Sequence, residues 1–230
     1  MIQILVNQTN FDGNWAAETL YSLFNPNQKV LIIPLTENNG YASDQTAWRD
    51  QFSENSEHYE DVIRPFIRYG ISRKNIKIFD IFDDYRENLK NYIQRFDIVC
   101  LVGEEELGCY STLSDYNFNS LLKDYDGILI TIGSAATPLT ESFPSYDEDM
   151  GYYTEYSGLG FLKGIDLVMN YVQSDEMLRY ISNAIEMRNQ KVLVCPKNSG
   201  ILLTDRSTEL FGEAFIADQK DLDEIYNLMK

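Results

Sequence analysis

The chain has 230 residues and carries 19 Lys and Arg against 36 Asp and Glu, which gives a formal net charge of −17. So acidic a protein has no electrostatic attraction for nucleic acid or for an anionic membrane surface, and we expect neither as a partner. Hydrophobic residues make up 44% of the chain, which is enough for a large core. The length suits one α/β domain spanning residues 1–230, with two small domains as the alternative, and no repeat or linker argues for a division.

Cysteine and histidine usage limits the chemistry further. The three cysteines, Cys100, Cys109 and Cys195, have irregular spacing, so we expect no disulfide framework and a reducing, cytoplasmic compartment. His58 is the single histidine, which excludes the usual zinc sites, and we expect no metal and no cofactor. The apolar run Ile2–Val6 is too short for a signal peptide, and no run approaches the roughly 18 apolar residues of a membrane span.

Short apolar runs alternate with apolar residues at helical spacing through the first half of the chain. The predicted strands are Ile2–Val6, Lys29–Pro34, Asn75–Asp80, Asp97–Val102 and Asp126–Ile132. The predicted helices are Trp15–Phe24, Glu57–Tyr69, Tyr85–Phe96 and a short helical segment that ends near Lys123. This alternation predicts a mainly parallel sheet with helices on both faces. The polar stretch Thr36–Asn55 is long for a connection, and we interpret it as a lid over the site.

The pattern changes after Gly133. Two further runs, Ile165–Val172 and Lys191–Cys195, are strand-like, and Asp175–Met187 has helical spacing. The remaining predicted elements are the strands Ser199–Leu203 and Glu213–Ala217 and the terminal helix Asp221–Met229. The two late strands indicate an antiparallel set that closes the sheet.

Two turns rich in small residues follow buried strands, where an open parallel sheet binds its ligands. One is Val102–Leu107 and the other is Ile132–Ala136, which contains Ser134. A sharp turn from strand to helix lifts one side chain above the sheet and aims backbone N–H groups at it. We therefore predict that Ser134 is an exposed nucleophile. The alternative is a tight or phosphate-binding turn without a nucleophile.

These turns and their spacing resemble the dipeptidase E and cyanophycinase group of serine peptidases over nearly the whole chain. Gly103 corresponds to the loop whose backbone forms the oxyanion hole, and Ser134 and Ala135 correspond to the nucleophile and its successor. Asp149–Met150 corresponds to an Asp-Met pair whose Asp is a charge-relay partner. Further matches are Gly158–Leu162 and Lys197–Leu202.

The resemblance implies a class I glutamine amidotransferase-like fold, which is a flavodoxin-like, three-layer α/β arrangement. It also implies a cytoplasmic serine peptidase in which Ser134 attacks a small peptide. The backbone N–H groups of Gly103, Glu104 and Ala135 would then hold the oxyanion.

The sequence departs from the family pattern at three places. The glycine-rich loop has become Glu104–Glu106, whose carboxylates oppose developing negative charge unless they point away or bind a cationic substrate. Ile132 and Ala136 stand where the family has glycines. Asn170 stands at the family histidine position, and an amide cannot accept a proton from serine near neutral pH.

Other residue patterns have two interpretations each. His58 is either a substitute base or a solvent-exposed residue. Cys109 is either an alternative nucleophile or a structural cysteine, while Cys100 and Cys195 read as core residues. Two acidic runs, the pair Asp83–Asp84 and the triplet Glu104–Glu106, either bind a hard cation or form solvated faces. The tyrosines near Asp149 either line a pocket or pack against each other; they are Tyr152, Tyr153 and Tyr156.

Two hypotheses for the function follow. The first is a serine peptidase similar to dipeptidase E, with Asp149 orienting the relay and His58, a carboxylate or water as the base. The second is a catalytically impaired relative that binds a small molecule or a partner. In both cases the expected ligand is a small peptide or another small molecule, and a homodimer is left open.

Overall fold

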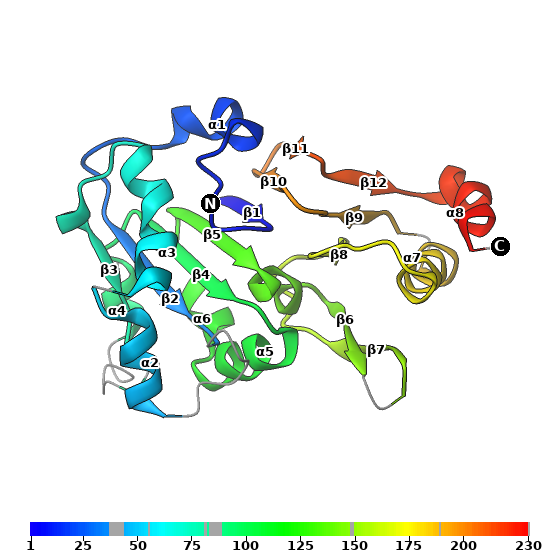
Figure 1. The fold of residues 1–230 in the computed structure, drawn as a ribbon, viewed down its shortest axis with the longest axis horizontal. Coiled ribbons are helices and arrows are strands. Elements are labelled where there is room, and N and C mark those ends of the chain that lie inside the picture. Colours follow the sequence, from blue (N-terminus) through cyan, green and yellow to red (C-terminus); the bar gives the residue numbers. More distant parts are fainter. Residues whose placement is uncertain are drawn as a thin grey trace.

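Seven strands form the central sheet in the order β11-β10-β1-β5-β4-β2-β3 (Figure 1). Strands β1 to β5 are parallel to one another, whereas β10 runs antiparallel to both β1 and β11. The strands are β1 (Ile2–Val6), β2 (Val30–Pro34), β3 (Ile76–Ile78), β4 (Ile98–Gly103), β5 (Ile128–Gly133), β10 (Ser199–Leu203) and β11 (Thr208–Gly212). The predicted α/β fold with a mainly parallel sheet is therefore confirmed.

The computed structural model describes residues 1–36, 44–54, 56–80, 82, 89–147, 150–188 and 190–229. Its α-helices are α1 (Asn14–Leu20), α2 (Gln45–Phe52), α3 (Glu57–Arg68), α4 (Leu89–Ile93), α5 (Glu106–Asp115), α6 (Phe118–Leu122), α7 (Asp175–Arg188) and α8 (Leu222–Leu228). A 3-10 helix, Ser134–Leu139, follows β5 directly. Within the described ranges, no helix combines the length and the apolar character that crossing a membrane requires.

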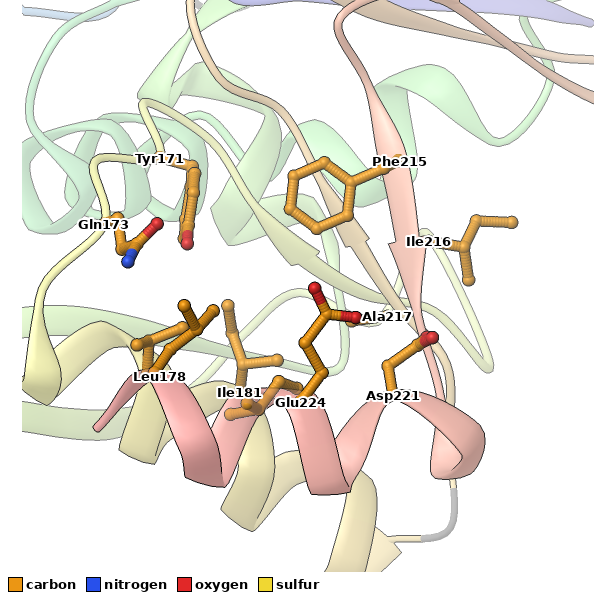
Figure 2. Close-up of a pocket in the computed structure, with 11 residues that line it drawn as sticks. Tyr171, Gln173, Leu178, Ile181, Phe215, Ile216, Ala217, Asp221 and Glu224 are labelled. Carbon is orange, nitrogen blue, oxygen red and sulfur yellow. The ribbon is translucent and has the colours of Figure 1, made fainter. Parts of the chain in front are cut away.

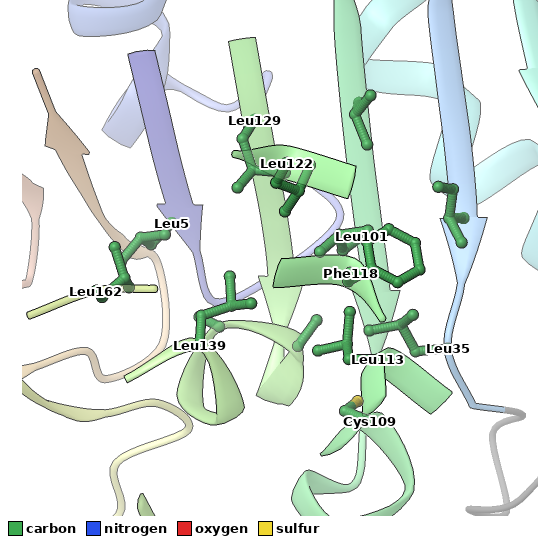
Figure 3. Packing of buried hydrophobic residues seen from close by; sticks show 14 of the residues in the cluster. Leu5, Leu35, Leu101, Cys109, Leu113, Phe118, Leu122, Leu129, Leu139 and Leu162 are labelled. Atoms are coloured by element: carbon green, nitrogen blue, oxygen red, sulfur yellow. The ribbon is translucent and has the colours of Figure 1, made fainter. Parts of the chain in front are cut away.

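Alternate residues of the central strands face two separate hydrophobic clusters. In β4, Ile98 and Cys100 belong to one cluster while Val99 and Leu101 belong to the other, since successive strand side chains point to opposite faces. Helices α1 and α3 contribute to the first cluster, and α4, α5 and α6 to the second, part of which is shown in Figure 3. Each fully buried Leu, Ile or Phe side chain contributes about 1.5–3 kcal/mol. The sheet is thus held between two helical layers.

A smaller sheet and a hairpin extend the fold beyond the central sheet (Figure 1). The smaller sheet has the order β12-β9-β8, with β8 (Asp166–Val168), β9 (Val192–Val194) and β12 (Phe215–Ala217). The hairpin pairs β6 (Ser142–Asp147) with β7 (Tyr152–Ser157). Arg188, the last residue of α7, connects these parts because its guanidinium pairs with Asp166 of β8 and donates to Ser142 Oγ of β6.

The structure differs from the sequence-based expectations in the connections. The stretch Thr36–Asn55, predicted to be a lid, contains helix α2, which begins after Asp44 and buries Trp48 and Phe52. The Asp44 side chain caps this helix by accepting from the N–H groups of Thr46 and Ala47. Residues 37–43 and 55 of the stretch lie outside the described residues.

Several predicted elements are shorter in the structure, and the largest differences are at β8 and α4. Strand β8 ends at Val168 rather than Val172, because Asn170 has a φ of +53° and the extended backbone cannot continue through it. Only Leu89–Ile93 of the predicted helix Tyr85–Phe96 is an α-helix among the described residues. Residues 83–88 lie outside them.

Candidate active site

Ser134 lies at the point where β5 gives way to the 3-10 helix. The preceding residue, Gly133, has φ +68° and ψ −141°, a conformation available almost only to glycine. A Cβ atom at position 133 would lie 2.7 Å from the carbonyl oxygen of Gly103. The close approach of β4 and β5 at this end therefore requires the glycine, and it fixes the sharp turn that places Ser134.

The Ser134 hydroxyl has a partner on each side. It donates to Glu106 Oε1 at 2.8 Å, and it accepts from Asn170 Nδ2 at 3.1 Å. The Ser134 side chain is fully buried, which differs from the exposed position predicted for it. The structure thus brings together Ser134 and Asn170, and it adds Glu106 as the nearest acceptor for the serine proton.

Glu106 owes its position to the start of α5. Glu105 caps this helix by accepting from the N–H groups of Leu107 and Gly108, so Glu106 is the first helical residue. Burial raises the pKa of the Glu106 carboxyl, and the hydrogen bond from Ser134 acts in the opposite direction. A carboxylate of raised pKa in contact with a hydroxyl is a competent proton acceptor.

Strand register contains the signal that would have found Glu106. Gly103 pairs with Gly133 across the parallel strands β4 and β5, so the turns after both residues lie at the same edge of the sheet. Ser134 follows one of these glycines at once, and Glu106 begins the helix after the other. The sequence pattern predicts an oxyanion role for the Glu104 backbone, but it presents the carboxylates of Glu104–Glu106 as one acidic run with no separate roles.

Asn170 is held by its backbone as well as its side chain. Its N–H donates to Asn7 Oδ1 at 2.8 Å, and Asn7 Nδ2 donates to the carbonyl oxygen of Pro196 at 3.1 Å. Asparagine tolerates the positive φ at this position better than most residues. The amide is therefore fixed as a hydrogen-bond donor toward Ser134 and cannot take its proton.

The predicted oxyanion-hole residues lie near this pair. The backbone N–H of Glu104 already donates to Thr36 Oγ1 at 3.0 Å, so that donor is occupied. Gly103 leaves no room for a side chain because a Cβ there would clash with Cys109 Sγ. Ala135 is fully buried. Of these residues, Ala135 continues the turn that carries Ser134.

All three cysteines are free and buried. Burial raises the pKa of each thiol above its ordinary value, which keeps Cys109 protonated and unreactive beside the candidate site. This supports the structural interpretation of Cys109 over its role as an alternative nucleophile.

A cavity of about 440 Å³ opens next to Ser134. Its lining residues are Asn7, Gln8, Thr9, His58, Val102, Gly103, Glu104, Ile132, Gly133 and Asn170. His58 is half-buried near the start of α3, and burial lowers the pKa of its imidazole against the opposing effect of Asp61. His58 and Asn170 therefore line the same cavity. The hydrogen-bond partners of Ser134 Oγ, however, are Glu106 and Asn170 rather than His58.

Several residues that the sequence predicts for the site are not found beside Ser134 in the described structure. Asp149, the predicted relay partner, and the pair Asp83–Asp84 lie outside the described residues. In the described part of the chain, no group of His, Cys, Asp or Glu side chains is arranged to hold a metal ion. The ring of Tyr153 packs edge-on against that of Tyr146, with 5.2 Å between the ring centroids. The ring of Tyr156 stacks on that of Phe143, with 5.8 Å between the centroids. These contacts support the packing interpretation.

A second cavity, of about 330 Å³, lies between α7, β12 and α8 (Figure 2). Leu178 and Ile181 of α7 face Phe215 of β12 across it, and Glu224 of α8 lies at its side. Its walls are mostly apolar, and it shares no lining residue with the cavity beside Ser134.

Comparison with known proteins supports the fold. No protein-family model and no curated protein sequence matches the chain. A protein from Listeria monocytogenes EGD-e that is assigned to peptidase E matches with a TM-score of 0.60 and 12% identity, over 91% of this chain and 96% of that one. A peptidase from an acI-B1 actinobacterium matches with a TM-score of 0.59 and 12% identity, over 94% of this chain and 93% of that one.

The chain has the peptidase E-like fold. The coverage on both sides shows that this likeness extends over nearly the whole length of each protein. The fold implied by the resemblance of Gly103, Ser134 and their surroundings is therefore confirmed. At 12% identity the likeness concerns the peptidase E-like fold, and the chemistry must be argued from the residues in the site.

Proposed function

We propose that this protein is a peptidase-like serine hydrolase in which Glu106 activates Ser134 toward a small peptide or related amide. The observation that carries the proposal is the hydrogen bond from Ser134 Oγ to Glu106 Oε1, at 2.8 Å. The position of this pair after the carboxyl ends of β4 and β5, in a peptidase E-like fold, supports it. The cavity volume of about 440 Å³ suits a small ligand.

The reaction divides into proton transfer and acyl transfer. Glu106 accepts the hydroxyl proton as Ser134 Oγ bonds to the carbonyl carbon of the substrate. The negative charge then develops on the carbonyl oxygen, for which the Ala135 N–H is the candidate donor beside the turn. The protonated Glu106 returns its proton to the leaving amine, and water hydrolyses the acyl-serine by the reverse sequence.

The partial burial of Glu106 makes this role chemically reasonable. A raised pKa brings a carboxylate closer to the operating pH, so it becomes a stronger base than an exposed carboxylate. Asn170 complements it because its Nδ2 donates to Oγ and helps hold the hydroxyl in line with Glu106. The pair thus replaces the serine–histidine contact that the family pattern has at position 170.

Access to Ser134 is a further requirement of the mechanism. The Ser134 side chain is fully buried, whereas its neighbours Gly133 and Asn170 line the cavity. Substrate entry must therefore shift the Asn170 amide or turn the Ser134 side chain so that Oγ reaches the cavity.

The same burial favours a second candidate function, a binding protein without turnover. In that case Asn170 closes the cavity over Ser134, and the occupied Glu104 N–H leaves the oxyanion without that donor. The cavity would then bind a small molecule, and the Ser134–Glu106 hydrogen bond would serve structure alone.

Labelling with a serine-reactive fluorophosphonate separates the two candidates. We expect the wild-type protein to be labelled and Ser134→Ala to remain unlabelled. Ser114→Ala serves as the matched control, because Ser114 is an exposed serine on α5. Absence of labelling in a wild-type protein with a folded circular dichroism spectrum would overturn the hydrolase and leave the binding protein.

A further inference from the structure

A small cavity at the edge of the central sheet where the parallel strands begin has an unusual charge. Its volume is about 210 Å³. Four cationic residues and two aromatic ones line it: Lys29, Lys74, Lys77, Arg95, Tyr92 and Phe96. None of the lining residues, all of them described by the structure, is acidic, although Asp and Glu outnumber Lys and Arg by 36 to 19 in the whole chain.

Strand topology brings three of these cations together. Lys29 immediately precedes β2, and Lys74 lies in the 3-10 helix that precedes β3. Arg95 lies between α4 and β4. Because β2, β3 and β4 are parallel neighbours, their amino ends meet at one edge of the sheet (Figure 1). The segments that precede these strands therefore converge there.

Lys77 contributes the fourth charge from within β3. Its neighbours along the strand, Ile76 and Ile78, belong to the hydrophobic cluster on the α3 side of the sheet. Successive side chains of a strand point to opposite faces, so Lys77 lies on the α4 side. Its side chain is exposed there and lines the cavity.

The four cations form no ion pair within the described ranges. A neighbouring cation, Arg73, is instead neutralised by Glu60 at 2.6 Å. The carboxylate of Asp97 accepts from the backbone N–H of Lys29 at 2.8 Å and does not pair with the Lys29 ammonium. Like charges that share a cavity repel one another, and an anion placed among them offsets that repulsion.

Two aromatic rings give the same cavity an apolar wall. The rings of Tyr92, on α4, and Phe96 pack against each other with 5.2 Å between their centroids. Phe96 also belongs to the buried cluster on the α4 side, which fixes its position. Lysine side chains can lay their apolar stems along such a wall while their ammonium groups stay in water. The cavity thus offers an apolar surface and a positive rim to one ligand.

We propose that this cavity binds a small anion that carries an apolar group, namely an aryl or alkyl phosphate. Four cations suit a doubly charged phosphate better than a singly charged carboxylate, and the Arg95 guanidinium can donate two hydrogen bonds to it. The net charge of −17 opposes this binding only weakly, because salt screens charges that lie more than about 8–10 Å away.

The proposed site is separate from the candidate active site. Ser134 follows the carboxyl end of β5, whereas the cavity lies where the parallel strands begin. A strand of six residues, such as β4, spans about 20 Å. The two cavities share no lining residue. The proposal therefore does not depend on the reactivity of Ser134.

A titration of the whole ¹⁵N-labelled protein, followed by the NMR shifts of its amides, tests the inference. The probe is phenyl phosphate near pH 8, where a phosphate ester is a dianion. Inorganic phosphate has the charge without the ring, and benzyl alcohol has the ring without the charge. We expect phenyl phosphate to bind at least about tenfold more tightly than benzyl alcohol and at least about threefold more tightly than inorganic phosphate.

Three results would overturn the proposal. The first is the absence of a saturable shift with phenyl phosphate up to about 10 mM. The second is equal affinity for phenyl phosphate and either comparison compound. The third is a set of shifted amides that excludes Lys74, Lys77 and Arg95. The affinity for phenyl phosphate should also fall when NaCl rises from about 20 to about 300 mM, because salt screens the cations.

Two double variants separate local charge from net charge. Lys74→Gln with Lys77→Gln removes two cations of the cavity and should weaken binding of phenyl phosphate about tenfold. Lys191→Gln with Lys197→Gln is the matched control, because both lysines are exposed and lie outside the cavity lining. This control should change the affinity less than about twofold. Equal effects of the two double variants would show a response to net charge alone and would overturn the proposal.

Tyr92→Leu tests the apolar wall, and Tyr92→Phe controls for loss of the hydroxyl. We expect Tyr92→Leu to bind phenyl phosphate and inorganic phosphate within about twofold of each other, whereas Tyr92→Phe should keep the wild-type preference. Circular dichroism checks that both variants are folded. An unchanged preference for phenyl phosphate in folded Tyr92→Leu would overturn the assignment of this ring to the ligand.

Discussion

Glu106 accepts the hydrogen bond of the Ser134 hydroxyl at 2.8 Å, although 28 residues separate the two in the chain. The contact exists because β4 and β5 are parallel neighbours whose carboxyl ends meet at Gly103 and Gly133. A partly buried carboxylate stands where a proton acceptor is needed, while the amide of Asn170 stands at the family histidine position.

The turn before Ser134 should tolerate only glycine. Gly133→Ala places a Cβ 2.7 Å from the Gly103 carbonyl oxygen and forces alanine into a φ of +68°, so we expect a loss of about 3 kcal/mol in the free energy of unfolding. Gly151→Ala is the matched control, because its φ of +70° is similar and no atom lies within 4 Å of the added Cβ. Urea denaturation measures both variants, and equal losses would contradict the close approach of β4 and β5.

Glu106→Gln should stabilise the folded protein in a pH-dependent way. Because burial raises the folded-state pKa of Glu106 above its unfolded value, wild-type stability declines as the pH rises from the unfolded pKa through the folded pKa. Glutamine keeps an acceptor for Ser134 and lacks the charge. Thermal unfolding should therefore show the variant more stable than wild type near pH 8, with the difference shrinking toward about pH 4. A variant that is less stable near pH 8 would show that the charged carboxylate is favoured by its surroundings.

Arg188 of α7 should be important for joining the hairpin to the smaller sheet. Arg188→Met leaves the carboxylate of Asp166, which is only 3% exposed, without its cation. We expect a loss of about 3 kcal/mol in the free energy of unfolding, the low end for a buried pair because Arg188 is partly exposed.

The matched control is Lys90→Met, which removes the lysine of an exposed pair with Asp124 and should have little effect. In the double variant Arg188→Met with Asp166→Asn, much of the lost stability should return, as measured by urea denaturation. A double variant as unstable as Arg188→Met would contradict the assignment of the loss to an unpaired charge.

His58→Ala distinguishes the two candidate bases. Because Ser134 Oγ bonds to Glu106 and not to the imidazole, we expect the rate of fluorophosphonate labelling to fall less than about tenfold. His58→Gln, which keeps a polar side chain in the cavity wall, controls for changes in packing against Phe52. Loss of labelling by more than about a hundredfold in both variants would make His58 the base.

Much of the central sheet could be predicted from the sequence because its strands are continuous apolar runs. The strands β4 and β5 are buried at every residue, so their pattern is plain, and the glycine before Ser134 marks the sharp turn. The hairpin β6–β7 could not be predicted because its second strand, Tyr152–Ser157, consists of tyrosines and polar residues and has no aliphatic run. The Ser134–Glu106 contact depends on strand register, which no local pattern records.

The exposure of Ser134 could not be predicted for a related reason. A turn of this kind directs its side chain above the sheet, but what covers that side chain comes from other parts of the chain. Here Asn170 reaches it from the segment after β8, with its own backbone held by Asn7 after β1. Asn170 lies 36 residues from Ser134 and 163 residues from Asn7 in the chain, so contacts between distant segments decide the burial.

The most direct test of the central claim is the pH dependence of fluorophosphonate labelling in wild type and Glu106→Gln. If Glu106 is the base for Ser134, wild-type labelling should increase as the pH rises through the raised pKa of Glu106, and Glu106→Gln should label at least about a hundredfold more slowly at every pH above it. Equal labelling rates for the two proteins across the pH range would contradict the account, because Ser134 would then react without its carboxylate partner.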